Sequence, residues 1–395
     1  MSVREFTVLG PLSNYIKMKK IRCAILLALT TMLASFTYGQ SEINKVPESK
    51  MKEIYEEVKT PYKYGMVVVP DTNIKKIDCP TVFRKGNKWC MTYIIFNGRG
   101  YETWLAKSDD LLNWKTQGRI LSFSDTTHWD NNQKAGYPAL EDTKWSGSYE
   151  LQKYDGKYWL SYFGGHDRGY EKGLLSISVA STDKDPSTAH EWQTLGKPVL
   201  MATDSNVSWW DNHTLYKETV IWDKAKTAGY PFLMYYNANG DSVNKKRGAE
   251  RIGMAVSNDM VHWMRNRKDP VLNHGAGITG DPNIEKIGNV WVMFYFGAFW
   301  KTHGGAFNRF ACSYDLVNWT DWDGEDLIKP SEVFDAQFAH KSFVVKYKGV
   351  VYHYYCAVNK ADQRGIAVAT SKDMGKSPVH FVAPPPSKAR SLKQN

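Results

Sequence analysis

The chain has 395 residues, of which 42% are hydrophobic and 23% are charged, proportions that exclude a disordered or collagen-like protein. Aromatic side chains make up 14% of the residues and favour a strand-rich fold. The net charge is +10, but residues 1–39 contribute +4 and the residues after Pro386 contribute +3. Because the remaining charge forms no basic stripe, we expect no nucleic-acid partner.

The first predicted element is a secretory signal peptide over residues 1–39. Met18–Arg22 is positively charged, Cys23–Phe36 is mostly apolar, and Gly39 is a small residue suited to cleavage. Translation could therefore begin at Met18. The apolar run has about 14 residues, fewer than the ~20 that cross a bilayer. We expect export to the periplasm or the extracellular space, with no membrane partner after cleavage.

Residues 40–61 are predicted to be an N-terminal extension that contains a short helix near Ser49–Ile54. The main domain is expected over residues 62–383, where Val67–Val69 could supply the closing strand of the last repeat unit. Residues 384–395 follow a run of three prolines and carry three basic residues, so they are predicted to be a flexible basic tail.

Four cysteines remain after signal cleavage, and none of them forms a C-x-x-C pair. Four cysteines in a chain of this length do not make a disulfide framework. We expect buried thiols. A bridge between Cys79 and Cys90 across a hairpin is the alternative that the sequence leaves open.

A repeated motif organises the main domain. The pattern S-x-D-[L/M]-[L/V]-[N/H]-W begins at Ser108, Ser257 and Ser313, and degenerate copies begin at Ser181 and Ser371. Self-similarity at this period is typical of propellers and arrays. The Ser and Asp side chains can hold a tight turn by bonding to the backbone, and the Trp is expected to pack between units.

Each unit also contains a hairpin of aromatic and β-branched residues around a Gly-containing turn. In the second unit, the predicted hairpin joins Tyr149–Leu151 to Tyr158–Leu160. A third strand then leads into the S-x-D turn, which gives four strands per unit. Five such units predict an all-β fold, a five-bladed β-propeller with a short N-terminal helical extension.

The catalytic candidates come from the start of the innermost strand of each unit, which should face the central channel. Residues at matching positions are Asp78, Glu150, Asp211, Asp281 and His340. Glycoside hydrolysis needs one carboxylic acid and one further carboxylate, and like charges held together raise one another's pKa values. We therefore predict that the four acidic residues are catalytic, although any one of them could be a turn or cap residue instead.

The repeat, the S-x-D-L-x-x-W turns, Asp78 and the Asp281-Pro282 pair resemble the five-bladed glycosidases of glycoside hydrolase families 43, 32, 62, 117 and 130. The resemblance covers residues 62–382. Family 43 implies that Asp78 is the general base and that Asp211 tunes the acid. The family pattern has Glu where this chain has Asp281, so Asp281 and Glu150 are both candidates for the acid.

The resemblance also bears on cofactors and stereochemistry. His340 resembles a family 43 histidine that is associated with a central cation or water. This leaves a structural calcium or other cation in the channel as an expectation, with His340 as a ligand; the alternative is a plain hydrogen-bonded histidine. No cofactor is expected to be required. Family 43 implies inversion of configuration and family 32 implies retention.

Sugar binding is expected from loops at the rim of the channel. Aromatic faces stack on sugars and guanidinium groups hydrogen-bond hydroxyls, although each Trp could equally pack between blades. The predicted substrate-binding residues, besides His340, are Trp129, Trp145, Trp209, Trp210, Trp300, Arg168 and Arg309.

The sequence as a whole predicts an exported glycoside hydrolase that acts on plant or algal oligo- or polysaccharides by carboxylate acid/base chemistry. One alternative is a non-catalytic glycan-binding propeller. Another is a phosphorylase or transglycosylase on the same fold, because His340-Lys341 resembles a phosphate site of family 130. The sugar, the linkage and the oligomeric state stay open.

Overall fold

The computed structural model describes residues 44–241 and 248–382. The predicted signal peptide and the predicted basic tail from residue 384 lie outside the described residues. Within the described part, no helix is both long enough and apolar enough to cross a membrane. The chain divides into a short N-terminal unit that ends at Lys45 and a large unit that begins at Val46. The fold below is that of the large unit.

The large unit is almost entirely β-structure, as predicted. One helix, α2 (Glu48–Val58), precedes the strands and buries Met51, Ile54 and Val58. These side chains belong to a core cluster with strand residues that include Val292 and Phe310. The predicted N-terminal helix is therefore present.

The first two sheets each contain four strands. One has the order β2 (Lys76–Lys85), β3 (Lys88–Phe96), β4 (Tyr101–Ser108) and β5 (Lys115–Leu121). The next has the order β6 (Gln133–Pro138), β7 (Tyr158–Gly165), β8 (Ser176–Thr182) and β9 (Gln193–Thr194). Each sheet is an antiparallel meander whose first strand is the innermost.

The third sheet has eight strands. Its first part contains β10 (Thr214–Trp222), β11 (Phe232–Asn239), β12 (Glu250–Ser257) and β13 (Trp263–Arg265), and its second part contains β14 (Ile278–Ile287), β15 (Val290–Trp300), β16 (His303–Ser313) and β17 (Thr320–Asp321). The two parts meet through a single parallel pair, Glu250 with Ile278.

The fourth sheet joins the two ends of the described residues. After the 3-10 turn η1 (Val333–Asp335) come β18 (Phe338–Tyr347), β19 (Val350–Val358) and β20 (Arg364–Thr370). The early strand β1 (Tyr62–Val68) pairs with β20 and completes this sheet. The prediction of a closing strand near Val67 is therefore confirmed.

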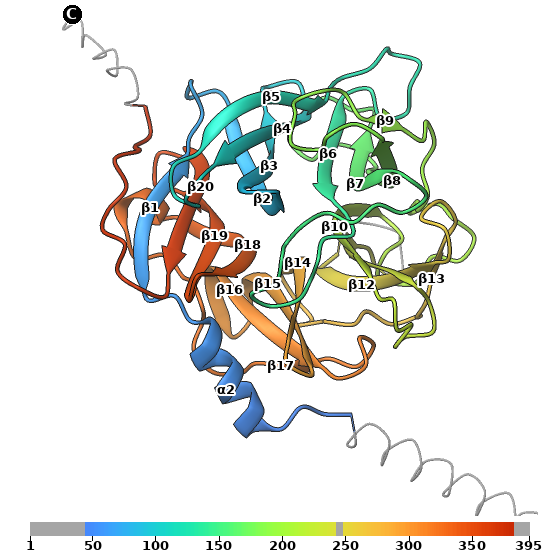
Figure 1. Cartoon of the computed structure of the whole chain (residues 1–395). Helices are drawn as coiled ribbons and strands as arrows, with labels where there is room; N and C mark the ends of the chain where they lie inside the picture. Colours follow the sequence, from blue (N-terminus) through green and yellow to red (C-terminus); the bar gives the residue numbers. More distant parts are fainter. Residues whose placement is uncertain (1–43, 242–247, 383–395) are drawn as a thin grey trace, which may run out of the picture. The chain divides into compact units, whose positions relative to one another are not determined.

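The sheets lie around a common centre, with β2, β6, β10, β14 and β18 nearest to it (Figure 1). These first strands contact one another in a closed cycle, from β2 to β6, β10, β14, β18 and back to β2. The fold is therefore all-β and propeller-like.

The repeated S-x-D motif forms the turn that the sequence predicts. Ser108 Oγ accepts hydrogen bonds from the backbone N–H groups of Asp110 and Leu111, and Asp110 Oδ1 accepts from the next two N–H groups along the sequence. The motifs at Ser257 and Ser313 repeat the same bonds. The side chains thus satisfy backbone donors that a tight turn leaves unpaired.

The Trp that ends each motif packs against a neighbouring group of strands. Trp114 meets Tyr354 of β19 edge-to-face at 5.8 Å, and Trp319 meets Tyr235 of β11 at 5.6 Å. The hydroxyl of Tyr354 also donates to the backbone oxygen of Leu111 at 2.6 Å. The motif therefore fixes a turn and packs adjacent groups of strands together.

The second unit differs from the prediction. Its hairpin is β6 with β7, in which Gln133 pairs with Gly165, and residues 139–157 connect the two strands. The predicted hairpin at Tyr149–Leu151 is therefore wrong. The sequence of β6 is QKAGYP, which lacks β-branched residues. It suits the site because a side chain on Gly136 would meet Leu121 at 2.8 Å.

All four described cysteines are buried free thiols, as expected. The open alternative of a bridge between Cys79 and Cys90 is not formed.

Candidate active site

A pocket opens at the centre of the sheets. Every group of strands contributes to its lining, either from an inner strand or from an adjoining segment. The polar residues that carry the chemistry are Glu171, Lys217, Glu250, Asp281, Lys341 and Arg364.

A shared irregularity in the inner strands explains why these side chains reach the pocket. The pairing register shifts by one residue after Asp78 in β2, after Leu215 in β10, after Gly280 in β14 and after His340 in β18. Such β-bulges re-aim side chains and are common beside active sites.

The residues that follow these register shifts line the pocket. Cys79, Asp281 and Lys341 occupy equivalent positions, and each has a positive φ, of 49°, 55° and 63° respectively. Tyr216 is the equivalent residue in β10 and also lines the pocket. Backbone geometry of this kind is costly for non-Gly residues and persists where the surrounding structure fixes it, often at functional sites.

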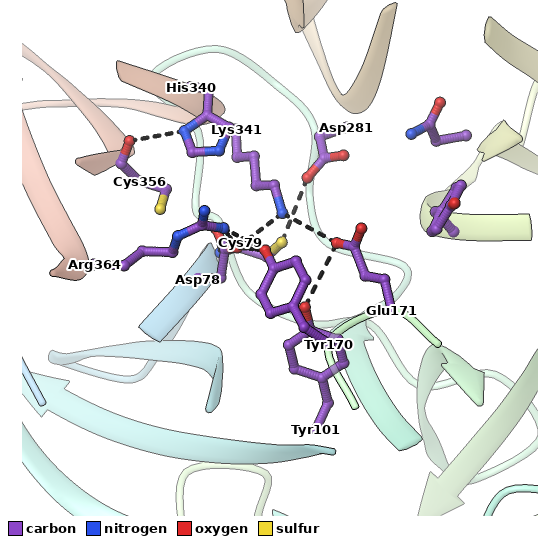
Figure 2. Close-up of polar contacts among 12 residues, drawn as sticks. Asp78, Cys79, Tyr101, Tyr170, Glu171, Asp281, His340, Lys341, Cys356 and Arg364 are labelled. Atoms are coloured by element: carbon purple, nitrogen blue, oxygen red, sulfur yellow. Dashed lines mark hydrogen bonds and ion pairs between the residues drawn. The ribbon is translucent and has the colours of Figure 1, made fainter. Parts of the chain in front are cut away.

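Asp78 lies behind the pocket wall at the centre of a charged cluster (Figure 2). Its Oδ2 atom lies 2.8 Å from Lys341 Nζ and 2.9 Å from Arg364 Nη1, and it accepts a hydrogen bond from Tyr170 at 3.0 Å. Burial raises the pKa of Asp78, but the two cations outweigh it and hold the pKa well below its ordinary value. Asp78 is therefore an ionised anchor for Lys341 and Arg364.

Glu171 is the pocket carboxyl with a raised pKa. Burial is the main cause, and the charges of Asp78 and Asp281 add to it, whereas Lys341, with Nζ 3.8 Å away, opposes it. Figure 2 shows Glu171 beside Lys341, with the hydroxyl of Tyr101 pointing at it. A carboxyl whose proton is retained toward neutral pH can act as a general acid.

Two further carboxylates line the pocket. Asp281 is 3% exposed and accepts a hydrogen bond from the Cys79 thiol at 3.4 Å. Glu250 is 7% exposed, and the Asn237 side-chain amide donates to it at 3.0 Å. Together with Glu171 they supply the two carboxyl groups that glycoside hydrolysis needs and one more.

Buried polar atoms without a partner mark the side of the pocket formed by β10 and β11. Lys217 Nζ and Asn237 Oδ1 have no hydrogen-bond partner among the described residues, although each residue is only 2% exposed. The Lys217 ammonium lies 5.3 Å from the centre of the Tyr137 ring. Because buried polar groups are normally satisfied, these atoms are suited to bind a polar ligand.

The predicted catalytic residues are brought together only in part. Asp281 and His340 line the pocket, and Asp78 lies directly behind it. Asp211 is fully buried elsewhere, where Arg265 at 2.6 Å and the hydroxyl of Tyr236 at 2.8 Å bind it. It ties the loop before β10 to β13, and it is not among the pocket-lining residues.

Glu150 also lies outside the pocket. It is exposed on the long connection between β6 and β7, where it accepts a hydrogen bond from the backbone N–H of Gly86 at 3.1 Å. Its neighbours give it a surface role in joining this connection to the β2–β3 turn.

None of the predicted tryptophans lines the pocket. Trp210 stacks on Tyr236, Trp300 on His274, Trp129 on Tyr162 and Trp145 on Phe294, while Trp209 lies under the guanidinium of Arg251. Arg309 is bound to Asp326, and Arg168 is exposed. The apolar wall of the pocket consists instead of Phe, Tyr and Ile side chains.

The predicted cation site offers few ligand atoms. Asp78, His340 and Cys356 place one ligand atom each within 4.8 Å of one another. Burial lowers the pKa of His340 to about 3 and raises that of the Cys356 thiol well above its ordinary value. Calcium takes six to eight oxygen ligands, so one carboxylate that already binds two cations does not suit it.

Comparison with solved structures identifies the family. A structure described as a glycoside hydrolase is 55% identical to this chain, covers 86% of it and is itself covered completely, with a TM-score of 0.83. The protein belongs to the glycoside hydrolases. A structure described as a complex of BT0996 and RGII is similar to this hydrolase to the same extent, with 56% identity, 86% and 100% coverage and a TM-score of 0.83.

A more distant likeness supports the fold alone. A family 117 glycoside hydrolase from Zobellia galactanivorans is 16% identical to this hydrolase over 82% of the chain and 96% of its own, with a TM-score of 0.56. No protein-family model and no curated protein matches the chain.

Proposed function

We propose that this hydrolase removes a sugar from a glycan of the RGII type in the central pocket, with Glu171 as the general acid. The observation that carries the proposal is the raised pKa of Glu171 in a pocket that holds two further buried carboxylates. The complex of the 56% identical relative supports the substrate class. A glycan of this type agrees with the carbohydrate substrate expected from the sequence.

Glu250 is assigned as the second catalytic carboxylate. The amide of Asn237 fixes its orientation from one side, which a base or nucleophile requires. Asp281 belongs to the charged cluster around Lys341 and raises the pKa of Glu171. Asp281 is therefore assigned to tune the acid, the role that the family resemblance implied for Asp211.

The sugar that is removed would occupy the side of the pocket at β10 and β11. Lys217 offers ammonium hydrogens and Asn237 offers an amide oxygen there. Asp78 would hold Lys341 and Arg364 in place beside the reacting bond. In this assignment Asp78 acts through the two cations and need not touch the sugar.

Three finer proposals accompany this function. The five four-stranded groups are proposed to be the blades of a five-bladed propeller, supported by the cycle of contacts among their first strands. Inversion of configuration is proposed on the resemblance to family 43. Export is proposed on the charged and apolar segments before Gly39, and N-terminal sequencing of the mature protein would test it.

The function is tested by sugar release from RGII oligosaccharides and from a panel of plant and algal oligosaccharides. The wild type should release a monosaccharide from an RGII oligosaccharide, at the same rate with and without phosphate. Glu171→Gln should abolish release, while Glu150→Gln, a matched change of an exposed glutamate, should not. Proton NMR of the first product anomer would show inversion or retention.

Unchanged release by Glu171→Gln would overturn the proposed acid. Release from other glycans but not from RGII would overturn the proposed substrate while leaving the pocket assignment intact.

A further inference from the structure

An exposed aromatic residue stands at the edge of the pocket. Phe299 lies near the end of β15 and lines the pocket with 55% of its surface exposed. The carboxylates deeper in the pocket are almost fully buried, as are Lys217 and Asn237. The lining therefore changes from buried polar groups to an exposed apolar ring.

The backbone of Phe299 is held in an unfavourable conformation. Its φ is 57°, and the pairing of β15 with β16 shifts register between Ala298 and Trp300. A bulky residue at positive φ is an outlier, and a β-bulge at this point re-aims the side chain. Strain of this kind persists when neighbouring structure fixes it and is concentrated at binding sites.

The neighbours of Phe299 fix this conformation. Trp300 Nε1 donates to the backbone oxygen of Ile278 at 2.7 Å. Gly277 packs so closely that a side chain on it would lie 2.2 Å from the oxygen of Ala298 and 2.5 Å from that of Phe299. Phe338, another pocket residue, meets the Phe299 ring edge-to-face at 5.8 Å. The exposed ring is thus held by its surroundings at the edge of the pocket.

We propose that Phe299 is the platform that binds the sugar on the leaving-group side of the scissile bond. This inference rests on the proposed function, because the buried polar end of the pocket would take the sugar that is removed. The leaving-group sugar would then lie toward the exposed edge, where the apolar C–H face of its ring can stack on Phe299. Aromatic walls with a few placed polar groups are typical of ligand pockets, and an exposed aromatic face gains most by burial under a ligand.

The test separates the two products of hydrolysis and uses them as inhibitors of the full-length enzyme. The first product is the released monosaccharide, and the second is the remaining oligosaccharide, each obtained from a glycan that the wild type hydrolyses. Three variants are compared: Phe299→Asn, which tolerates a positive φ; Phe299→Tyr, which keeps the ring; and Met264→Ala, a matched exposed apolar residue outside the pocket lining.

Phe299→Asn should raise the inhibition constant of the oligosaccharide product about tenfold and leave that of the monosaccharide unchanged. Its melting temperature should equal or exceed that of the wild type, because the strain is relieved. Phe299→Tyr and Met264→Ala should leave both inhibition constants within about twofold of wild type.

Equal weakening of both products, or a melting temperature that falls together with the affinity, would show a structural role and overturn the proposal. An unchanged inhibition constant for the oligosaccharide would overturn it as well. Failure of the proposed acid is distinguishable, because it would appear in Glu171→Gln turnover and leave the product inhibition of the Phe299 variants as it is.

Discussion

Glu171 is subject to opposing influences that set its protonation. Burial raises its pKa, Lys341 lowers it, and the negative charge of Asp281 raises it further. A general acid must be protonated, so activity should fall as the pH rises through the pKa of Glu171. The charges around this residue therefore set the upper pH limit of activity.

The variant Asp281→Asn tests this arrangement. It removes a negative charge that raises the pKa of Glu171, so that pKa should fall and the alkaline limb of the kcat/KM profile should move to lower pH. The measurement is a pH–rate profile on the hydrolysed glycan. An alkaline limb that stays in place or moves upward would contradict the proposed role of Asp281.

Asp211→Asn is the matched control for this change. Asp211 is also a buried aspartate, but it binds Arg265 outside the pocket. Its loss should leave the alkaline limb in place and lower the free energy of unfolding by about 3 kcal/mol, because a buried cation loses its partner.

At the residue scale, the sequence predicts part of the pocket. Asp281 and His340 lie where the inner-strand pattern places them, because their strands begin with the bulge. Asp211 has the same spacing but precedes β10, in which the position equivalent to Asp78 is Leu215. No local pattern marks Glu171, which follows β7 on a loop.

At the scale of elements, the S-x-D turn is the part most fully predicted from sequence, because its bonds are local. Asp110 accepts two backbone N–H bonds at 2.9 and 2.8 Å. The inner-strand bulges, in contrast, depend on pairing with a neighbouring strand. The hairpin of the second unit was missed for the same reason, because β6 has little strand propensity of its own and is held by its contacts.

Asp110→Ala tests the turn. It removes an acceptor for two backbone donors and should lower the free energy of unfolding by about 1–2 kcal/mol, as measured by denaturant titration. Asp109→Ala is the matched control, because Asp109 is exposed and only pairs with Lys88 at the surface, so the change should be within about 0.5 kcal/mol. Equal effects of the two changes would contradict the proposed contribution of the turn.

At the scale of the whole molecule, pairing of β1 with β20 connects the start of the large unit to its end. The sequence predicts this closure from one apolar segment and from the repeat count. Long-range closure leaves no unpaired inner edge in this sheet, which protects the strands from pairing with other proteins.

Two truncations test this closure. Removing residues 1–45 deletes the short unit and should leave the melting temperature unchanged. Removing residues 1–69 also deletes α2 and β1, exposes the edge of β20 and should give aggregated or unfolded protein by size-exclusion chromatography and circular dichroism. A folded, monomeric product of the longer truncation would contradict the closure.

The most direct test of the catalytic assignment compares two leaving groups in two variants. Protonation by Glu171 is needed for a sugar leaving group but not for a good one such as 4-nitrophenolate. Glu171→Gln should therefore lose about 10³-fold in kcat on the glycan and keep activity on the matching 4-nitrophenyl glycoside within about tenfold. Glu250→Gln should lose activity on both. Full activity of Glu171→Gln on the glycan, or of Glu250→Gln on either substrate, would contradict the account.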